Sequence, residues 1–125
     1  MTLHESGQMY LEAIYVLLQK SNKIRAIDIG AYLGYTKPSV SRAVGLLKKN
    51  EYISVDIDGY ITMTLKGKSF AEQLYERHIV LTNMLMALGV DEKTASEDAC
   101  RIEHVISDKS FSAVKKHYLD YKSKI

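Results

Sequence analysis

The sequence has little of several features, and each shortage excludes a class of protein. One cysteine cannot form an internal disulfide, which excludes a disulfide-stapled secreted fold. One proline and seven glycines exclude collagen-like or low-complexity sequence. No apolar run is long enough to span a bilayer, and no basic segment leads into an apolar core at the N-terminus. We therefore expect neither a membrane partner nor a signal peptide, and the cytoplasm as the compartment.

The composition is that of an ordinary globular protein, with 46% hydrophobic and 26% charged residues in 125. This length predicts one compact domain, or a small domain with an oligomerisation arm.

The charge is unevenly distributed along the chain. Residues 20–70 hold nine basic and four acidic side chains, and the remainder holds eight basic and eleven acidic ones. The basic segment suggests an anionic partner, although a solvated surface explains it equally well.

Apolar spacing predicts a mainly helical fold with one small β-hairpin. Tyr52–Val55 and Tyr60–Met63 are β-prone runs on either side of a turn that contains Asp58-Gly59. Helices are expected over residues 5–20, 26–33, 36–50, 65–88 and 91–107, with a last one from about residue 110. The expected stripe of the 65–88 helix is Phe70, Leu74, His78, Leu81, Leu85 and Leu88, and the last helix carries Phe111, Val114, Tyr118 and Tyr121.

The order helix, tight turn, helix, hairpin is that of a winged helix-turn-helix, whose second helix enters the DNA major groove. Arg42 can hold guanine with two hydrogen bonds, whereas Lys49, Lys66 and Lys68 are expected to contact phosphate. A solvated polar face is the competing explanation; the hairpin and the local positive charge favour DNA. The candidate DNA-binding residues are Thr36, Lys37, Pro38, Ser39, Ser41, Arg42 and Lys49.

A second pattern lies in the acidic part, where Cys100, Glu103 and His104 can project from one face of a helix. Thiolate, carboxylate and imidazole together chelate a divalent transition metal. A buried cysteine beside a surface Glu-His pair is the alternative, but further donors count against it. Met9 and Glu12 share a face of the first helix, and His78 lies on the apolar stripe of the long helix.

Several segments together resemble the diphtheria toxin repressor/manganese transport regulator family. They are Met9–Tyr15, the helix-turn-helix around Thr36–Ser41, Leu65–Lys68, Arg77-His78 and Ala99–Ser107. The resemblance implies a metal-activated, dimeric winged-helix repressor. It implies a DNA-binding domain over residues 1–70, a helical metal-binding and dimerisation domain over residues 71–125, and a metal site between them. Because the chain stops at Ile125, the resemblance is to the short members without an SH3-like domain.

The resemblance to the two branches of the family is mixed. Met9, Cys100, Glu103 and His104 match the primary site of the iron-responsive branch, whereas Glu12 and His78 match second-site ligands of the manganese branch. An iron-type ancillary site would need Glu at Thr82 and His at Ser96, and both are missing. Thioether and thiolate donors favour Fe(II), Co(II), Ni(II) or Zn(II) over Mn(II). Among these, the resemblance implies Fe(II) as the physiological metal, with Mn(II) second, whereas Zn(II), Co(II) and Ni(II) are ions expected to bind in vitro.

We therefore expect a metal-dependent repressor of metal homeostasis genes. It would act as a homodimer, because the helices over 91–107 and from 110 onward have apolar stripes that a small DNA-binding domain could not cover. Two-fold symmetry predicts a palindromic double-stranded operator. A metalloenzyme built on Cys100, Glu103 and His104 is the first alternative, but it leaves the helix-turn-helix unexplained, and we expect no enzyme. A metal-independent winged-helix module that binds protein is the second.

Overall fold

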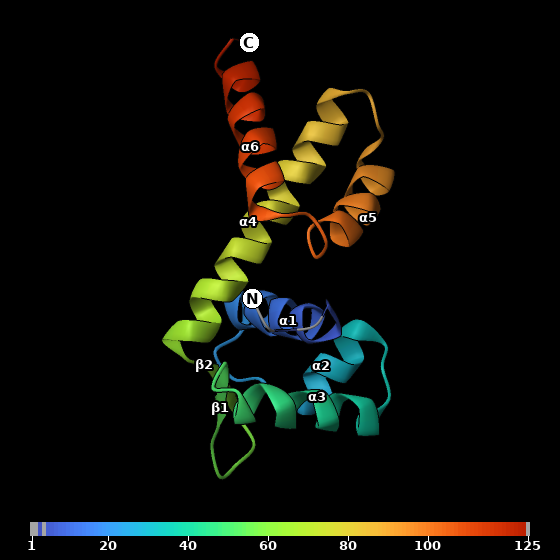
Figure 1. The fold of residues 1–125 in the computed structure, drawn as a ribbon. Helices are drawn as coiled ribbons and strands as arrows, with labels where there is room; N and C mark the ends of the chain where they lie inside the picture. The colour runs from blue at the N-terminus through green and yellow to red at the C-terminus, as the bar shows by residue number, and fades with distance from the viewer. Residues whose placement is uncertain (1–2, 4, 125) are drawn as a thin grey trace. The chain divides into compact units, whose positions relative to one another are not determined.

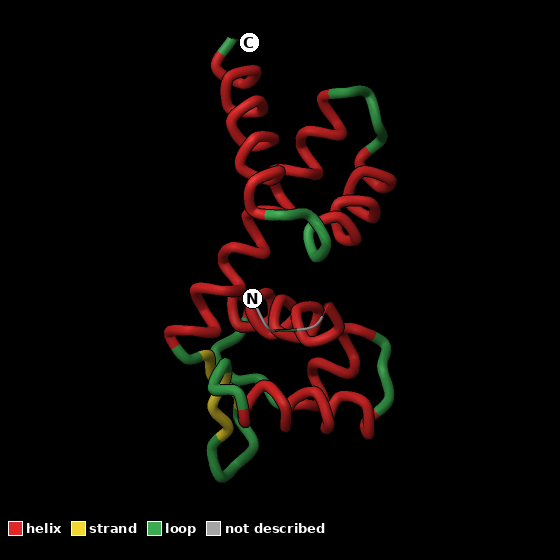
Figure 2. The backbone as a smooth tube through the Cα atoms, viewed as in Figure 1, coloured by secondary structure: helices red, strands yellow, loops and turns green. Residues whose placement is uncertain are grey.

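A computed structural model of the chain describes residue 3 and residues 5–124, and this part is mainly helical with one two-stranded sheet (Figures 1 and 2). The expected fold class is confirmed. The elements are α1 (Glu5–Lys20), α2 (Ala26–Leu33), α3 (Lys37–Lys49), β1 (Ile53–Val55), β2 (Ile61–Met63), α4 (Leu65–Ala87), α5 (Glu92–Ile102) and α6 (Asp108–Ser123).

The chain forms two compact units that divide after Glu72, inside α4. The expected domains, 1–70 and 71–125, include residues 1, 2, 4 and 125, which lie outside the described residues. Their boundary stays a prediction. Across the described residues, no helix combines the length and the apolar character needed to cross a membrane.

The helix-turn-helix of the first unit is built by local signals in the sequence. Gly34 has a left-handed backbone, with φ of 73°, and its N–H donates to the Gly30 carbonyl at the end of α2. Thr36 is the N-cap of α3, and its Oγ1 accepts from the Ser39 N–H at 3.4 Å. Pro38 falls in the first turn of α3, where its missing N–H costs no helical hydrogen bond. All three features were expected and are confirmed.

The hairpin follows α3 directly and forms the wing of this motif. Its strands are antiparallel, with Ile53 opposite Met63 and Val55 opposite Ile61. The Asp56 carboxylate accepts from the N–H groups of Asp58 and Tyr60, both at 2.9 Å, and so closes the turn. The expected hairpin is therefore confirmed, and its turn is stabilised by an aspartate side chain.

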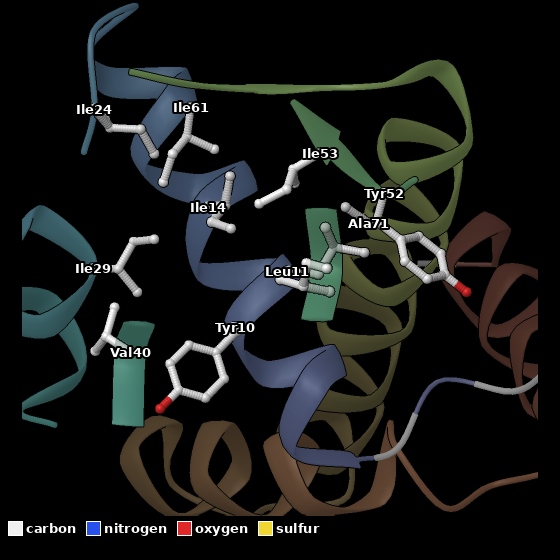
Figure 3. Packing of buried hydrophobic residues seen from close by; sticks show 11 residues of the cluster. Tyr10, Leu11, Ile14, Ile24, Ile29, Val40, Tyr52, Ile53, Ile61 and Ala71 are labelled. Atoms are coloured by element: carbon white, nitrogen blue, oxygen red, sulfur yellow. The ribbon is translucent and has the colours of Figure 1, made fainter. Parts of the chain in front are cut away.

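The core of the first unit joins α1 to the helix-turn-helix, the wing and the start of α4. Leu11 and Ile14 of α1 are fully buried, and Figure 3 shows them among the other residues of this cluster. Val40 and Leu47 of α3 are 2% and 1% exposed. Because the apolar side of α3 is anchored in this core, its polar side faces outward on a rigid support.

The start of α4 lies tightly against the chain before the wing. The Thr64 hydroxyl donates to the Glu51 carbonyl at 2.7 Å and accepts from the Gly67 N–H at 3.0 Å. A Cβ on Gly67 would overlap the Tyr52 carbonyl oxygen and lie 2.9 Å from its carbonyl carbon. Gly67 is therefore required by the close approach of two backbones.

We expect Gly67→Ala to destabilise the protein by about 1–3 kcal/mol, because the added methyl group forces the Tyr52 backbone and α4 apart. The measurement is the free energy of unfolding in urea. Gly45→Ala is the matched control. A Cβ there has no neighbour within 4 Å, so alanine should stabilise α3 by about 0.5–1 kcal/mol through helix propensity. Equal effects of both substitutions would contradict the close-approach explanation.

The second unit packs α5 and α6 around the later part of α4. Its core is formed by Val80, Leu81, Ala99 and Phe111. Asp91 caps α5, and hydrogen bonds from the Thr94 backbone N–H and hydroxyl lower the pKa of its carboxyl. Ser107 caps α6 by accepting from the Ser110 N–H at 3.1 Å.

One expectation for this unit is wrong. The predicted helix over 91–107 ends at Ile102, whereas α6 begins at Asp108, close to the expected start near residue 110. The reason is the Ser107 cap, which starts a new helix after a short turn. Leu88, the last residue of the expected stripe of the 65–88 helix, is 71% exposed.

Candidate metal centre and nucleic-acid interface

The end of α5 and the turn after it carry three potential metal donors. Cys100 lies in the last turns of α5, Glu103 is the C-cap residue and His104 follows in the turn. The expectation that one helix holds all three is therefore wrong. Glu103 nevertheless keeps a right-handed helical backbone, with φ of −58° and ψ of −27°. The helical spacing thus continues past the hydrogen-bonded helix and brings the donors together.

The donor atoms of these residues converge. Cys100 Sγ, a Glu103 carboxylate oxygen and a His104 ring nitrogen lie within 4.8 Å of one another. The side chains of Glu103 and His104 are 0% and 2% exposed, and His104 Nε2 lies 3.3 Å from Glu103 Oε1. A soft thiolate, a hard carboxylate and an imidazole at this separation suit a divalent transition metal. These three residues fit the ion that the sequence predicts.

His78 reaches the same carboxylate from α4. Its Nδ1 lies 3.1 Å from Glu103 Oε2, and its Nε2 lies 3.4 Å from the Ser96 hydroxyl on α5. Burying an ionised carboxylate is costly unless other groups pair with it. His78 and His104 flank the two oxygens of Glu103, so the structure brings together four of the six predicted metal-site residues. The sequence indicated only that Ser96 stands where an iron-type ancillary site would need a histidine. Its contact with His78 depends on the packing of two helices and cannot be predicted from spacing.

The other two predicted donors, Met9 and Glu12, lie three residues apart on α1 in the first unit, and both are half-buried.

Arg77 is a residue to which the sequence assigned no role. Its Nη1 donates to the carbonyl oxygens of Ile106 and Glu103, at 2.7 and 3.3 Å. No periodic signal connects residues 26 and 29 positions apart, so only the structure reveals this contact.

The polar side of α3 is open to solvent. Ser39 is an exception among the candidates, because it is half-buried and its hydroxyl accepts from that of Thr36 at 3.0 Å. Lys66 makes contacts within the chain: its ammonium donates to the Asn50 carbonyl at 3.0 Å and lies 4.3 Å from the Tyr52 ring centroid. Its expected phosphate contact stays a prediction. The exposed candidates are Thr36, Lys37, Pro38, Ser41, Arg42 and Lys49.

Both parts of the chain match domains of known repressors. Residues 2–60 match the N-terminal DNA-binding domain of the iron-dependent repressors, and residues 64–123 match their metal-binding and dimerisation domain. The chain is 30% identical to an uncharacterised HTH-type transcriptional regulator of Methanocaldococcus jannaschii, over 98% of this chain and 100% of that one. It is 33% identical to the transcriptional regulator MntR of Bacillus subtilis, over 87% of this chain and 77% of MntR.

Solved structures agree with these matches. The manganese regulator SloR superimposes with a TM-score of 0.80 at 29% identity, and ScaR with bound Zn²⁺ with a TM-score of 0.76 at 25% identity. The matches cover 97% and 92% of this chain, but about half the length of those two proteins, 55% and 54%. The chain therefore belongs to the diphtheria toxin repressor/manganese transport regulator family of metal-dependent transcriptional repressors.

Proposed function

We propose that this protein is an Fe(II)-activated, homodimeric repressor of metal homeostasis genes that binds a palindromic operator in the cytoplasm. The observation that carries the proposal is the cluster of Cys100, Glu103 and His104, whose donor atoms lie within 4.8 Å of one another around a buried Glu103. It would act by binding DNA and not as an enzyme, as the DNA-binding and dimerisation domains of its family indicate.

The thiolate of Cys100 and the thioether of Met9 support Fe(II), because soft donors favour it over Mn(II). Mn(II) is the second candidate. SloR is a manganese regulator and ScaR a manganese-activated repressor by name, and His78, which the resemblance matches to a manganese-branch ligand, lies 3.1 Å from Glu103. Zn(II), Co(II) and Ni(II) are expected to bind in vitro, because affinity rises along the first-row series from Mn(II) to Cu(II) and stays high at Zn(II).

A divalent cation would be the positively charged centre that all of these donors bind. The proposed ligands of the second unit are His78, Cys100, Glu103 and His104, and the sequence adds Met9 and Glu12 from α1. If both units supply ligands, the arrangement of the protein that binds DNA would bind the metal more tightly than other arrangements do. Metal and DNA would then each strengthen the binding of the other by the same factor.

The exposed apolar residues of the second unit support the homodimer. Leu88 and Val105 are each 71% exposed, and Leu119 is 50% exposed. Large apolar side chains that a monomer leaves exposed are candidates for burial in an assembly. A two-fold dimer would place two copies of α3 on successive turns of the major groove, about 34 Å apart, which is the basis of the palindromic operator.

The test is a DNA-binding titration at buffered free concentrations of each metal. The probe is DNA selected from a random-sequence pool with Fe(II)-loaded protein under anaerobic conditions. Fe(II) should tighten binding about 5- to 150-fold relative to metal-free protein, which corresponds to a coupling of about 1–3 kcal/mol. Equal affinity of the metal-free protein would instead support the metal-independent winged-helix module. Activation by Mn(II) alone would support the second candidate metal.

The proposed DNA contact lies at the start of α3, where Arg42 would read bases. The residues proposed to line it are the N-cap Thr36 and, on α3, Lys37, Pro38, Ser39 and Ser41. Arg42→Ala should cost about 1–3 kcal/mol of operator affinity and relax specificity at one position per half-site. Lys49→Ala is the control, because a phosphate contact should weaken all sequences alike and reduce the salt dependence. Binding to selected and random DNA is compared by fluorescence anisotropy. A uniform loss in Arg42→Ala would show that Arg42 contacts phosphate.

A further inference from the structure

Arg77 is a largely buried arginine on α4, next in sequence to His78. Its side chain is 11% exposed. Nη1 donates to the carbonyl oxygens of Glu103 and Ile106, and Nη2 pairs with the Asp108 carboxylate at the start of α6. The guanidinium carbon lies 5.2 Å from the centroid of the Phe111 ring. One side chain thus contacts both ends of the turn that joins α5 to α6.

This turn needs an external partner for its backbone. The carbonyl groups of Glu103 and Ile106 lie beyond Ile102, the last residue of α5, so they have no partner within that helix. The guanidinium is a planar, rigid group with five donors, so it can satisfy two carbonyl oxygens and a carboxylate at once. These hydrogen bonds are also charge-assisted, which makes them stronger than bonds between neutral groups. Arg77 therefore fixes the backbone of residues 103–106.

The fixed backbone is the one that carries two of the converging donors. Glu103 is held by its main chain through Arg77, and its carboxylate lies 3.1 Å from His78, the next residue of α4. The backbone contact and the side-chain contact thus come from neighbouring positions on one helix. Without the first contact, the turn could rotate and carry the Glu103 carboxylate and the His104 imidazole away from Cys100.

We propose that Arg77 is a positioning residue of the metal site, which holds the 103–106 turn so that the donors of Cys100, Glu103 and His104 converge. The proposal rests on the proposed function, because it takes these three residues as metal ligands. The contacts of Arg77 are with two backbone carbonyl oxygens, the Asp108 carboxylate and the Phe111 ring. It acts through the backbone of a ligand, as partners outside the ligand shell commonly do.

The experiment measures the Co(II) affinity of the 125-residue chain by the thiolate-to-cobalt absorption band. Arg77→Met removes every donor and keeps the apolar packing against Phe111. We expect Co(II) to bind this variant about 10- to 100-fold more weakly than wild type, the range found when partners of metal ligands are removed. Arg77→Lys should restore part of the affinity, because an ammonium can reach a carbonyl oxygen but cannot present a planar fork.

Two control variants separate positioning from a general role in the fold. Lys115→Met removes the Glu76–Lys115 ion pair, which also joins α6 to α4, with 2.8 Å between its charged atoms, but does not touch the turn. Asp108→Asn changes the α6 partner of Arg77 and leaves both carbonyl contacts. Both controls should bind Co(II) as wild type does, even where urea unfolding shows a small loss of stability.

The outcomes are distinct. Unchanged Co(II) affinity in Arg77→Met would overturn the proposal, and so would an equal loss in Lys115→Met. If Arg77→Met does not fold by circular dichroism, Arg77→Lys decides: affinity equal to wild type overturns the proposal, and a several-fold loss in a folded protein supports it. A wild-type protein that shows no thiolate band would overturn the metal site itself, and therefore the proposed function.

Discussion

Replacing His104 with alanine should leave a folded protein whose DNA binding no longer tightens when metal is added. The His104 side chain is 2% exposed, and its Nε2 lies 3.3 Å from Glu103. Each ligand of a four-ligand site contributes on the order of 3 kcal/mol, because structural Zn²⁺ sites contribute about 10–16 kcal/mol in total. Losing one ligand should therefore weaken metal binding about a hundredfold, since a factor of ten is about 1.4 kcal/mol.

The measurement compares the affinity for selected DNA with and without metal in wild type and His104→Ala. At a metal concentration that saturates wild type, the variant should retain the affinity of the metal-free protein. His117→Ala is the matched control, because His117 is an exposed histidine on α6 of the same unit. The control should respond to metal as wild type does. Equal metal enhancement in His104→Ala would remove His104 from the metal response.

The fold of the first unit could be predicted from the sequence because its signals are local. The bounds of α1 and α2 agree with the expected ranges, 5–20 and 26–33. Gly34 and Thr36 end one helix and begin the next through hydrogen bonds within four residues. Apolar spacing and caps therefore contain nearly all the information that this region needs.

The end of α5 could not be predicted in this way. Ala95, Ala99, Ile102 and Ile106 have helical spacing, so periodicity extends the expected helix to Ser107. The helix ends earlier because Ser107 caps α6 and because Arg77, which is distant in the sequence, donates hydrogen bonds to two carbonyl groups of the turn. Periodicity describes which face is apolar, but it contains no information on which distant side chain satisfies a backbone carbonyl.

The candidate metal site was predicted from spacing, although the expected helix does not hold all of it. Cys100, Glu103 and His104 converge because Glu103 keeps helical dihedrals beyond the last helical residue. The contacts of His78 with Glu103 and Ser96 depend on how α4 packs against α5. The candidate ligands can thus be predicted from the sequence, whereas the contacts of His78 with Glu103 and Ser96 are determined by tertiary packing.

The softness of Cys100 should decide which metal the protein prefers, and Cys100→Asp should shift the preference toward Mn(II). Cys100 is the only cysteine in the chain, so this change removes the only thiolate. A carboxylate is a hard donor that suits Mn(II), whereas thiolate favours Zn(II), Co(II) and Fe(II). Loss of the thiolate should weaken Zn(II) and Co(II) binding by on the order of 3 kcal/mol, about one ligand's share of a four-ligand site.

The affinities of wild type, Cys100→Asp and Cys100→Ser for Zn(II), Co(II) and Mn(II) are measured by competition with a chelator of known affinity. Serine removes the thiolate without adding a charge, so it should weaken all three metals. Aspartate should keep or raise the Mn(II) affinity while Zn(II) and Co(II) fall, because it returns a negative oxygen donor to the position next to Glu103 and His104. The ratio of Mn(II) to Zn(II) affinity should therefore rise in the aspartate variant relative to the serine variant. A parallel loss of all three metals in both variants would mean that Cys100 contributes to packing and not to the choice of metal.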